Sequence, residues 1–468
     1  MTAADQHADA ASELSGRRVL VMGVGRSGDA AARALLRHGA DVTVTDAATG
    51  EAATSAATAL SAAGATVSLG GADPDAGAYD LIVPSPGIPQ HHPVLEAAAT
   101  RRVPVWSEPE LAWRLARGRT RLVAVTGTNG KTTTTEMTAA CLRAPTAGNI
   151  GTPLTTLLDA DDTPPVVVAE LSSFQLRFAH TLRPAVAVLL NIAPDHLDWH
   201  GDMAAYRAAK ARLWANQEPG DAVVVNDDDA EARQAIADHP AASRRLGFTL
   251  RAPDRDQVGV RNGVVTAVLD GSESPIVAVE RLAVAGPHNV ANVCAAAAAA
   301  LAAGASAATL ASPLADYHSG HHRLEHVATV GGVAYVDDSK ATNPHAAAAA
   351  LSSFAEGKVL WIAGGLGKGL SFASLGPLVR RHVRAVFTIG TSGPDVAAVA
   401  RAVGVAVHEA GTLNVAVAAA ARAARPGDTV LLAPACASMD QFTDYAARGD
   451  AFRAAVAALA TQGAGSGR

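Results

Sequence analysis

The stretch VAVTGTNGKTTTT, residues 123–135, decides the fold of this chain. An apolar run enters a turn that contains Gly127 and Gly130, and the Thr-rich segment opening at Lys131 is typical of a helix N-terminus. The backbone N–H groups of such a turn, the positive end of the helix and the lysine all favour phosphate, while the Thr132 hydroxyl suits Mg²⁺. The stretch therefore predicts a loop that binds a nucleoside triphosphate.

This loop is a shortened variant, because the full Walker spacing would need a glycine where Val125 stands. An ordinary glycine-rich turn between a strand and a helix is the alternative interpretation. We favour the phosphate loop because Gly, Lys and Thr follow the strand in the order that the chemistry requires.

Length and composition limit the possible classes of protein. The chain has 468 residues, so about three domains are expected at roughly 100–200 residues each. A net charge of −6 and an aromatic content of 4% argue against nucleic acid as a partner. The longest uncharged stretch, 282–315, is mostly alanine interrupted by prolines and glycines, so we expect buried helix and no membrane span.

The cysteines and the two ends of the chain carry further expectations. Three cysteines that lie far apart fit a reducing compartment, which predicts a cytoplasmic protein. Residues 1–16 contain acids but no Lys or Arg, so we expect a loose tail and not a signal peptide. The final TQGAGSGR, from Thr461, predicts a mobile tail.

Upstream of the phosphate loop, residues 18–46 predict a strand, a glycine turn, an amphipathic helix and a second strand. Gly23, Gly25 and Gly28 form GxGxxG, and Asp46 lies where an acid could meet a ribose hydroxyl. This pattern indicates a βαβ unit, but a dinucleotide, another nucleotide-linked ligand and a purely structural turn all stay open. A third strand pattern ends in a Ser-Pro-Gly turn, and such strand ends bind ligands in open α/β sheets.

Downstream of the loop, three apolar runs are typical of central parallel strands, and each ends in polar groups: Asn149, Glu170, and Asp195 with His196. Because the carboxyl ends of parallel strands line one crevice, we expect these groups to face the phosphates, with Glu170 able to hold Mg²⁺. Lys210 lies in a periodic helix, and taken alone it predicts a solvated surface lysine.

The rest of the middle region carries weaker signals. The strand VVVN leads into an acidic turn, 227–229, which we expect to be solvated, and the patterns over 245–279 predict a small antiparallel β-region. A long Ala-rich helix then opens near His288, Asn289 and Asn292. Asparagine is poor in a helix interior, so Asn292 suggests a side-chain role such as reading a purine edge, whereas N-capping explains Asn289 or His288 about equally well.

The last third of the chain again places polar groups at strand ends. The run GVAYVDD leads into Ser339, Lys340 and Thr342 before a helix. VLWIAGG leads into a glycine-rich turn whose Lys368 suits a carboxylate or a phosphate, and VLLAPACA ends near Ser438.

Eight motifs occur in this order between Thr126 and Phe442: TGTNGKTT, GNIG, ELSSFQL, DHLDWHG, GPHNVAN, HHRLE, DDSKATNP and PACASMDQF. Together they resemble the Mur ligases, and ELSSFQL with PACASMDQF favours the D-glutamate-adding branch of that family. The resemblance implies an α/β protein of three domains. These are a Rossmann-like UDP-substrate-binding domain (1–109), a central P-loop ATP-binding domain with a small β-region (110–319) and a Rossmann-like C-terminal domain that binds the amino acid (320–468).

The resemblance implies an ATP-dependent ligase that adds D-glutamate to UDP-N-acetylmuramoyl-L-alanine through an acyl phosphate, in peptidoglycan precursor synthesis. The GxGxxG unit would then hold the UDP-linked substrate and not NAD. Three alternatives stay open: another Mur or folylpolyglutamate-type ligase with a different amino acid, a nicotinamide dehydrogenase, and a nucleotide-gated binding protein without turnover. We expect a monomer whose partners are these small molecules.

The resemblance also assigns binding residues, position by position. The positions that match ATP contacts are Gly127, Thr128, Asn129, Gly130, Lys131, Thr132, Thr133, Asn289, Asn292, His322, Arg323, Asp338 and Lys340. The positions that match contacts to the UDP-linked substrate are Arg26, Ser27, Asp46, Gly87, Asn149 and His196. The positions that match the D-glutamate pocket are Thr342, Lys368, Ser438, Met439 and Tyr445.

Four residues carry the chemistry that the resemblance implies: Lys131, Glu170, His196 and Lys210. One Mg²⁺ would be held by Thr132 and Glu170, and a second by Glu170, His196 and Lys210. Lys210 matches a lysine that is carbamylated in the family. In that modification CO₂ adds to the neutral amine and makes a carboxylate-like metal ligand. The resemblance therefore replaces the interpretation of Lys210 as a surface lysine.

The chain departs from the family pattern at two positions near the glutamate pocket. Leu366 stands where an acid is common, and Tyr445 stands where phenylalanine is common. Neither departure touches the phosphate loop.

Overall fold

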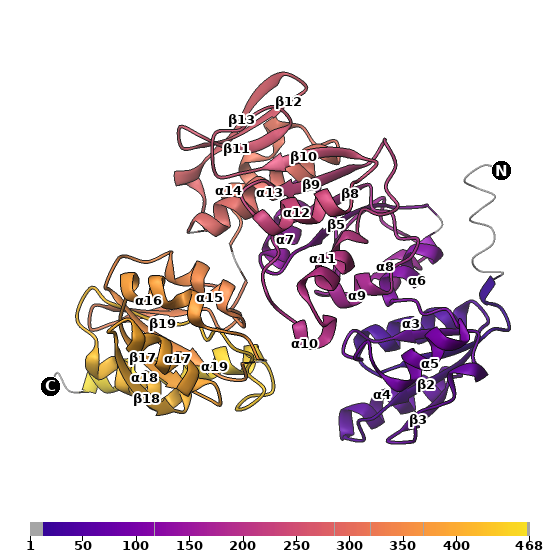
Figure 1. The fold of residues 1–468 in the computed structure, drawn as a ribbon, viewed down its shortest axis with the longest axis horizontal. Coiled ribbons are helices and arrows are strands. Elements are labelled where there is room, and N and C mark those ends of the chain that lie inside the picture. The colour runs from indigo at the N-terminus through magenta and orange to yellow at the C-terminus, as the bar shows by residue number, and fades with distance from the viewer. Residues whose placement is uncertain (1–12, 117, 285, 319, 368, 466–468) are drawn as a thin grey trace. The chain divides into compact units, whose positions relative to one another are not determined.

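The computed structural model describes residues 13–465 except 117, 285, 319 and 368. Residues 1–12 of the tail expected over 1–16, and residues 466–468 of the tail expected over 461–468, therefore lie outside the described residues. The chain forms two compact units. The first unit runs to Ile192 and adds Trp199–Leu282 and Ala291–Asp316. The second unit consists of Ala193–Asp198, Ala283–Val290 and Tyr317–Arg468. Figure 1 shows three α/β sheets along the chain, two in the first unit and one in the second.

The first sheet is parallel, with the strand order β3-β2-β1-β4. Its strands are β1 (Arg18–Met22), β2 (Asp41–Asp46), β3 (Thr66–Leu69) and β4 (Leu81–Pro84). Helices α3 (Arg26–Arg37) and α4 (Glu51–Ala62) pack on one face, and α5 (Pro93–Arg101) packs on the other. The strand order reverses beside β1, so the carboxyl ends of β1 and β4 form the crevice where such a sheet binds ligands. The predicted βαβ unit is confirmed.

Two local features set the packing of this sheet. A Cβ on Gly28 would lie 1.9 Å from the carbonyl oxygen of Gly23, so glycine is what lets α3 approach the β1 turn. Leu14 is buried in the same core as α3, and the prediction of a loose tail through residue 16 is therefore wrong at its end.

The central sheet has nine strands in the order β13-β12-β11-β10-β9-β8-β5-β7-β6. They are β5 (Arg121–Thr126), β6 (Thr146–Gly148), β7 (Val166–Glu170), β8 (Val186–Leu189), β9 (Ala222–Asn226), β10 (Arg244–Phe248), β11 (Gln257–Arg261), β12 (Val264–Leu269) and β13 (Ser272–Ala278). Only β11, β12 and β13 pair antiparallel, whereas β10 runs parallel to β9 and β11. The predicted antiparallel region is thus correct for its last three strands and wrong for β10, which continues the parallel sheet.

The acidic turn after β9 is solvated only in part, because Asp228 is exposed as predicted whereas Asp227 is not. Asp227 is buried and accepts hydrogen bonds from Arg245 and from Gln257, the latter at 2.7 Å. Asp229 caps the next helix by accepting from the backbone N–H of Ala232 at 2.7 Å. Because β9 lies inside the sheet and not at its edge, its carboxyl end faces neighbouring strands that supply partners for these acids.

Helices precede, alternate with and follow these strands along the chain, and several of them contact the sheet. They are α6 (Glu108–Ala116), α7 (Lys131–Leu142), α8 (Leu154–Leu158), α9 (Ser173–Arg177), α10 (Leu197–His200), α11 (Met203–Ala211), α12 (Ala230–Asp238), α13 (Pro287–Ala302) and α14 (Ala311–Ala315). The alanines 295–300 of α13 are fully buried, which confirms the prediction of a buried Ala-rich helix. Among the described residues, no helix combines the length and the apolar character needed to cross a bilayer.

The third sheet belongs to the second unit and has the order β14-β15-β19-β16-β17-β18. Its strands are β14 (Glu325–Val330), β15 (Val333–Asp337), β16 (Val359–Gly364), β17 (Val383–Ile389), β18 (Ala406–Gly411) and β19 (Thr429–Leu432), and β14 alone is antiparallel to its neighbour. One face carries α15 (Pro344–Leu351), α16 (Gly376–His382) and α17 (Gly393–Ala402), and the other carries α18 (Leu413–Ala423) and α19 (Tyr445–Gly465).

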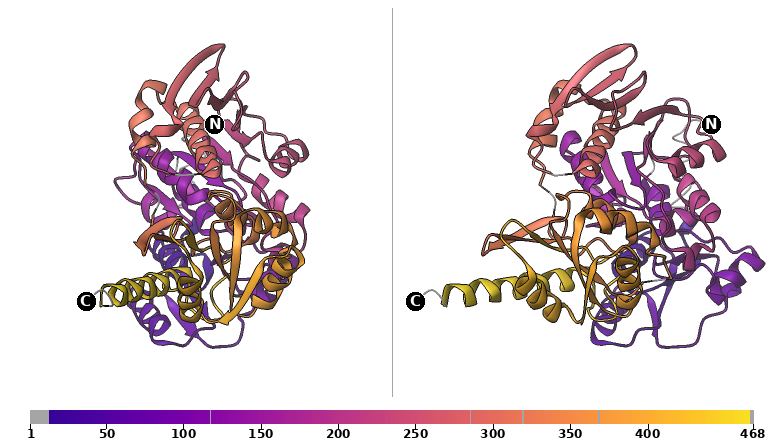
Figure 2. Two further views of the ribbon diagram at one scale, coloured as in Figure 1. Left: turned by 90° about the vertical axis from the view of Figure 1, so that its left-hand side faces the viewer. Right: turned by 60° about the vertical axis from the view of Figure 1, so that its left-hand side comes forward.

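Figure 2 shows α19 in yellow as one long helix that runs to the end of the described chain. The helix continues through Gly465, beyond Thr461 where the sequence predicted a mobile tail. With three helix-covered sheets that are parallel in most pairings, the predicted α/β fold class is confirmed.

Candidate active site

The phosphate loop has the predicted strand–turn–helix form, with β5 leading through residues 127–130 into α7. Gly130 stands at the N-cap of α7 with φ +82°, a conformation that favours glycine. Lys131 Nζ donates to the carbonyl oxygens of Gly127 at 3.1 Å and Thr128 at 2.8 Å, so it lies over its own loop. Thr133 is buried in the first turn of α7.

The apex of the loop is held by a residue that sequence reasoning missed. Asn191 Oδ1 accepts from the backbone N–H of Asn129 at 2.9 Å, and Asn191 Nδ2 donates to the carbonyl oxygen of Asn129 at 3.0 Å. Asn191 follows β8 directly, so the strand-end signal that selected Glu170 could also have selected it. This pair of hydrogen bonds fixes the loop apex to the neighbouring strand.

Glu170 ends β7 beside the loop, and the residue is 2% exposed. Its Oε2 accepts from Thr132 Oγ1 at 2.6 Å, and its Oε1 accepts from Asn149 Nδ2 at 2.7 Å. The structure thus brings together three predicted site residues from three elements. A carboxylate and a hydroxyl at the foot of a phosphate loop are hard oxygen donors, and this donor set fits Mg²⁺.

Lys210 is 1% exposed, so the prediction made from its helix alone, a solvated lysine, is wrong. Its Nζ donates to the carbonyl oxygen of Gly127 at 2.9 Å and lies 4.6 Å from the centre of the Tyr206 ring. The Tyr206 hydroxyl lies 3.2 Å from Thr128 Oγ1. Helix α11 therefore brings a buried amine to the back of the phosphate loop.

Asn292 also reaches the loop. Its Oδ1 accepts from Thr134 Oγ1 at 3.4 Å, and a Cβ added to Gly130 would lie 2.4 Å from the same oxygen. The structure therefore places this residue of α13 against the first turn of α7.

A cavity of about 290 Å³ lies where the first and central sheets meet within the first unit. Its lining includes Arg26, Ser27, Ser85, Asn149 and Gln175. The first two come from the start of α3, and Asn149 is the residue that donates to Glu170. The cavity therefore joins the GxGxxG unit to the neighbourhood of the phosphate loop.

Asp46 and Gly87 of the first unit, which are also predicted for the UDP-linked substrate, do not line this cavity. Asp46 Oδ2 accepts from the backbone N–H of Val24 at 2.8 Å, and its Oδ1 accepts from Ala48 N–H at 2.8 Å, so this carboxylate braces the glycine turn. Gly87 is exposed beyond the end of β4.

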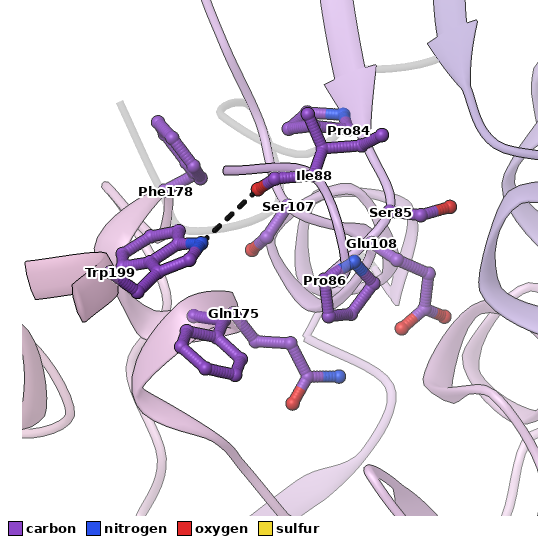
Figure 3. A pocket seen from close by; sticks show the side chains of 10 residues that line it. Pro84, Ser85, Pro86, Ile88, Ser107, Glu108, Gln175, Phe178 and Trp199 are labelled. Carbon is purple, nitrogen blue, oxygen red and sulfur yellow. Dashed lines mark hydrogen bonds between the residues drawn. The ribbon is translucent and has the colours of Figure 1, made fainter. Parts of the chain in front are cut away.

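A second cavity, of about 10 Å³, lies next to the first and shares Ser85, Pro86 and Gln175 with it. Figure 3 shows its side chains, with the Trp199 indole donating to the carbonyl oxygen of Ile88 at 3.3 Å. The space is that of one water molecule. Ser85 Oγ and Glu108 Oε2 both line it, and neither has a hydrogen-bond partner among the described residues.

Among the residues that line the second cavity, Glu108 has an unusually high pKa. Burial raises its pKa to about 7, against the opposing effect of hydrogen bonds from Thr155, whose Oγ1 donates to Oε1 at 2.7 Å. Sequence reasoning did not single out Glu108, and its burial depends on α6 and α8 packing together, which no local pattern reports.

In the second unit, His196 follows Asp195 with φ +54°. Asp195 Oδ1 accepts from the backbone N–H of His196 at 3.0 Å, and Asp195 Oδ2 accepts from Asn343 Nδ2 at 3.0 Å. Asn289 is buried in the first turn of α13, next to His288, whose pKa burial lowers to about 4 with a further contribution from His345.

The predicted ATP residues of the C-terminal sheet lie at the end of β15. His322 Nδ1 lies 2.7 Å from Asp337 Oδ2 in a buried pair, with Arg323 next to it in sequence. Asp338 Oδ1 accepts from the Leu324 N–H at 3.2 Å, and burial raises the pKa of Asp338 to about 7. The structure brings these residues together in one strand-end cluster.

Four of the predicted D-glutamate residues lie in the segments after β15 and β19 or at the start of α19. Lys340 Nζ lies 3.8 Å from the centre of the Tyr445 ring, and the backbone N–H of Thr342 donates to the carbonyl oxygen of Lys340 at 2.8 Å. Ser438 is buried, whereas Met439 beside it is 60% exposed. Lys368 lies outside the described residues.

Family models match three segments of the chain. Residues 17–107 match the Mur ligase MurD-like N-terminal domain, residues 125–300 match the Mur ligase middle domain, and residues 322–436 match the Mur ligase glutamate ligase domain. Together these matches cover most of the described chain.

Curated relatives match along almost the whole length. A UDP-N-acetylmuramoylalanine–D-glutamate ligase of Frankia casuarinae is 49% identical over 452 residues, which are 95% of this chain and 94% of the relative. Proteins of the same name from Streptomyces avermitilis and Thermobifida fusca are 44% and 43% identical, over 95% and 96% of this chain and 98% and 100% of theirs.

Solved structures share the fold at low identity. MurF from Acinetobacter baumannii aligns with a TM-score of 0.59 at 20% identity, covering 92% of this chain and 94% of its own. A pseudomurein peptide ligase type C from Methanothermus fervidus aligns with a TM-score of 0.58 at 18% identity, covering 95% of this chain and 100% of its own.

Proposed function

Because the chain belongs to the Mur ligase family, we propose that it is the ligase that adds D-glutamate to UDP-N-acetylmuramoyl-L-alanine, with ATP converted to ADP and phosphate. The observation that carries the proposal is the 49% identity to a ligase of that name over 95% of the chain. The cluster of Thr132, Glu170 and Asn149 under the phosphate loop supports the chemistry. The solved relatives at or below 21% identity support the fold and give no reason to prefer another amino acid.

The chemical problem is that a carboxylate is a poor electrophile, because its charge is delocalised and its leaving group would be oxide. We propose that the L-alanyl carboxylate attacks the γ-phosphorus of ATP, so that an acyl phosphate forms and ADP leaves. The D-glutamate amine then attacks the acyl carbon, loses a proton, and phosphate leaves as the amide forms. The first step brings two anions together, so positive groups contribute most of the catalysis.

The phosphate loop supplies the first of these positive groups. Lys131 would leave the carbonyl oxygens of its own loop and bind the β- and γ-phosphates, while the backbone N–H groups of residues 127–130 and the N-terminus of α7 bind the remaining oxygens. Asn292, next to Gly130, and Asn289 would contact the nucleotide, together with His322, Arg323, Asp338 and Lys340. Holding the phosphates in one geometry favours in-line attack.

Magnesium fits the donors at Thr132 and Glu170, where it would neutralise phosphate charge when bound. We propose a second metal set of Glu170, His196 and a carbamate on Lys210. The support for the carbamate is the position of this buried amine behind the phosphate loop, where addition of CO₂ to its neutral form would create an anionic oxygen ligand for a metal. Carbon-13 NMR of the protein in ¹³C-bicarbonate should then give one carbamate resonance that Lys210→Arg lacks.

The substrates divide between the sheets. We propose that Arg26, Ser27, Asn149 and His196 bind the UDP-linked substrate, with Asp46 and Gly87 shaping the glycine turn and the strand-end beside it. The cavity of about 290 Å³ supports the assignment of Arg26, Ser27 and Asn149, because these three residues line it. Thr342, Lys368, Ser438, Met439 and Tyr445 would form the D-glutamate pocket.

We further propose domain boundaries at 109/110 and 319/320, a monomer, and a cytoplasmic location, which the three widely separated cysteines support. The first boundary falls in the first turn of α6, which starts at Glu108.

The test is release of phosphate from ATP, measured with each substrate omitted in turn. The proposal predicts that release requires ATP, Mg²⁺, UDP-N-acetylmuramoyl-L-alanine and D-glutamate together. Equal release with L-lysine or L-glutamate in place of D-glutamate would overturn the assignment of the amino acid.

A further inference from the structure

Arg448 is the most deeply buried arginine that the structure describes, at 1% exposure. It lies in the first turn of α19, and burial lowers its pKa to about 10, so the guanidinium is still charged at neutral pH. The mechanism above assigns it no contact with a substrate. A buried cation is costly unless its donors are satisfied, so its partners are informative.

The guanidinium makes five hydrogen bonds, all to two strand-end segments. Two of these hydrogen bonds go to the segment after β15. Arg448 Nε donates to Ser339 Oγ at 3.0 Å, and Nη2 donates to the Ser339 carbonyl oxygen at 2.9 Å. The other three go to the segment after β19. Nη1 and Nη2 each donate to the Cys436 carbonyl oxygen at 3.1 Å, and Nη1 also donates to the Ala437 carbonyl oxygen at 3.2 Å. One side chain therefore spans both segments.

These segments carry the residues proposed for two different substrates. Ser339 lies between Asp338 and Lys340, which are proposed for ATP. Cys436 and Ala437 directly precede Ser438, which is proposed for D-glutamate.

A third segment joins the same cluster through the backbone. Ala437 and Leu366 exchange hydrogen bonds at 2.9 and 3.0 Å, which ties the turn after β16 to the turn after β19. A Cβ on Gly365 would lie 2.3 Å from the Ala437 carbonyl oxygen and 3.2 Å from Arg448 Nη1, so the three segments are closely packed.

The first turn of α19 adds a second link. Ser339 Oγ, which accepts from Arg448, donates to the carbonyl oxygen of Tyr445 at 2.7 Å, and the Tyr445 ring lies against the Lys340 ammonium. Arg448 and Tyr445 are one helical turn apart, so α19 contacts the β15 segment through both residues.

We infer that Arg448 is a positioning residue that holds the ATP-binding and D-glutamate-binding strand ends in one fixed arrangement; this inference rests on the function proposed above. Its planar fork of N–H donors matches carbonyl oxygens on two chain segments, a geometry that the single ammonium of a lysine does not reproduce. Loss of the guanidinium should therefore loosen the segments after β15 and β19 together.

The test compares Arg448→Lys and Arg448→Met with the wild-type protein, at a temperature where each variant is folded. The expected result is at least a tenfold rise in the KM for ATP and for D-glutamate, with the KM for the UDP-linked substrate changed less than twofold. Lysine should retain more function than methionine. If both variants fail to fold, Ser339→Ala, which removes one acceptor and the link to Tyr445, should raise the same two constants.

Arg384→Met is the matched control, because this arginine ties the opposite end of the same sheet. Its Nη2 donates to the Ala423 carbonyl oxygen at 2.8 Å and to Asp428 Oδ2 at 2.6 Å. It should lower the Tm and leave all three KM values unchanged. The inference is overturned if the variants of Arg448 or Ser339 likewise lower only the Tm. A wild-type protein without ligase activity would instead refute the proposed function.

Discussion

Gly130 is the residue on which the phosphate loop depends most directly. Its φ of +82° and its distance to Asn292 leave no room for a side chain, since a Cβ would lie 2.4 Å from Asn292 Oδ1. We predict that Gly130→Ala costs about 1–2 kcal/mol in the free energy of unfolding for the left-handed backbone alone. The KM for ATP should also rise, because either the loop or the Asn292 side chain must shift, and both are proposed to contact the nucleotide.

Gly16→Ala is the control for this prediction. Gly16 has φ +73°, and a Cβ added to it would have no atom within 4 Å, so the substitution carries the backbone cost without the clash. It should lose similar stability in urea denaturation and keep the wild-type KM for ATP. An unchanged KM for ATP in Gly130→Ala would contradict the role assigned to the loop.

Glu108 gives the protein a pH-dependent stability of known sign. Its folded pKa of about 7 lies above the ordinary value of 4.5, so the stability associated with the protonated acid is complete below pH 4.5 and is lost as the pH rises through 7. The substitution Glu108→Gln keeps the shape of the side chain and removes its ability to carry a negative charge. We predict that the variant is more stable than the wild type at pH 8, by at most about 3 kcal/mol, and that the difference vanishes near pH 4.5.

Glu110, two residues along α6, supplies a control of opposite sign. Burial alone would raise its pKa, but hydrogen bonds from Thr181 and His180 together with Arg114 hold it below the ordinary value. Glu110→Gln should therefore be less stable than the wild type at neutral pH and approach it as acid protonates the wild-type carboxylate. Because the wild-type Glu110 carboxylate is protonated only below pH 4.5, chemical denaturation from about pH 3 to pH 8 is needed to measure both variants. Parallel pH profiles for the two would contradict the account of Glu108.

At the scale of elements, the ends of β5, β7 and β8 position the groups that are proposed to bind the phosphates. Asn191 at the end of β8 holds Asn129 through two hydrogen bonds, one in each direction. We predict that Asn191→Leu raises the KM for ATP about tenfold, since each lost hydrogen bond is worth about 1 kcal/mol and the loop apex loses its support. Titration calorimetry with ADP measures the same loss as binding affinity.

Asn226→Leu is the matched variant on the next strand. Asn226 Nδ2 donates to the Leu190 carbonyl oxygen at 2.8 Å, so it supports the end of β8 without touching the loop. It should bind ADP as the wild type does. Equal weakening in both variants would mean that general loosening of the sheet, and not the loop contact, determines affinity.

The elements also explain what the sequence could predict. Apolar runs that end in a polar residue located the ends of β5, β7 and β15, because a parallel strand buried on both faces has a simple pattern. Lys210 escaped that reasoning since α11 is rich in alanine, which suits a buried or an exposed face equally, and only tertiary packing decides which face is covered. The buried Asp227 was missed for the same reason, as its partners come from β10 and β11.

Local sequence patterns cannot predict contacts between residues that lie far apart in the chain. Arg448 contacts Ser339, which lies 109 positions away, and Glu108 contacts Thr155, 47 positions away. Family resemblance selected the residues proposed to touch substrates, whereas the structure was needed to find those that hold them.

At the scale of the whole molecule, one rule recurs in all three sheets: polar residues gather at the carboxyl ends of parallel strands. In the first unit these ends carry the glycine turn and the phosphate loop, and in the second they carry Asp338, Lys340 and Ser438. The binding of one substrate at each of these three ends, as proposed above, would suit a reaction that first activates an acid and then presents an amine.

The central claim is that a phosphate loop with Lys131 at its tip activates the alanyl carboxylate for attack by D-glutamate. The most direct measurement is incorporation of radiolabelled D-glutamate into UDP-N-acetylmuramoyl-L-alanine by the purified protein with ATP and Mg²⁺. We predict a labelled UDP-linked dipeptide product with the wild type and at least a hundredfold less with Lys131→Ala. No labelled product from the folded wild type, or undiminished product from Lys131→Ala, would contradict the claim.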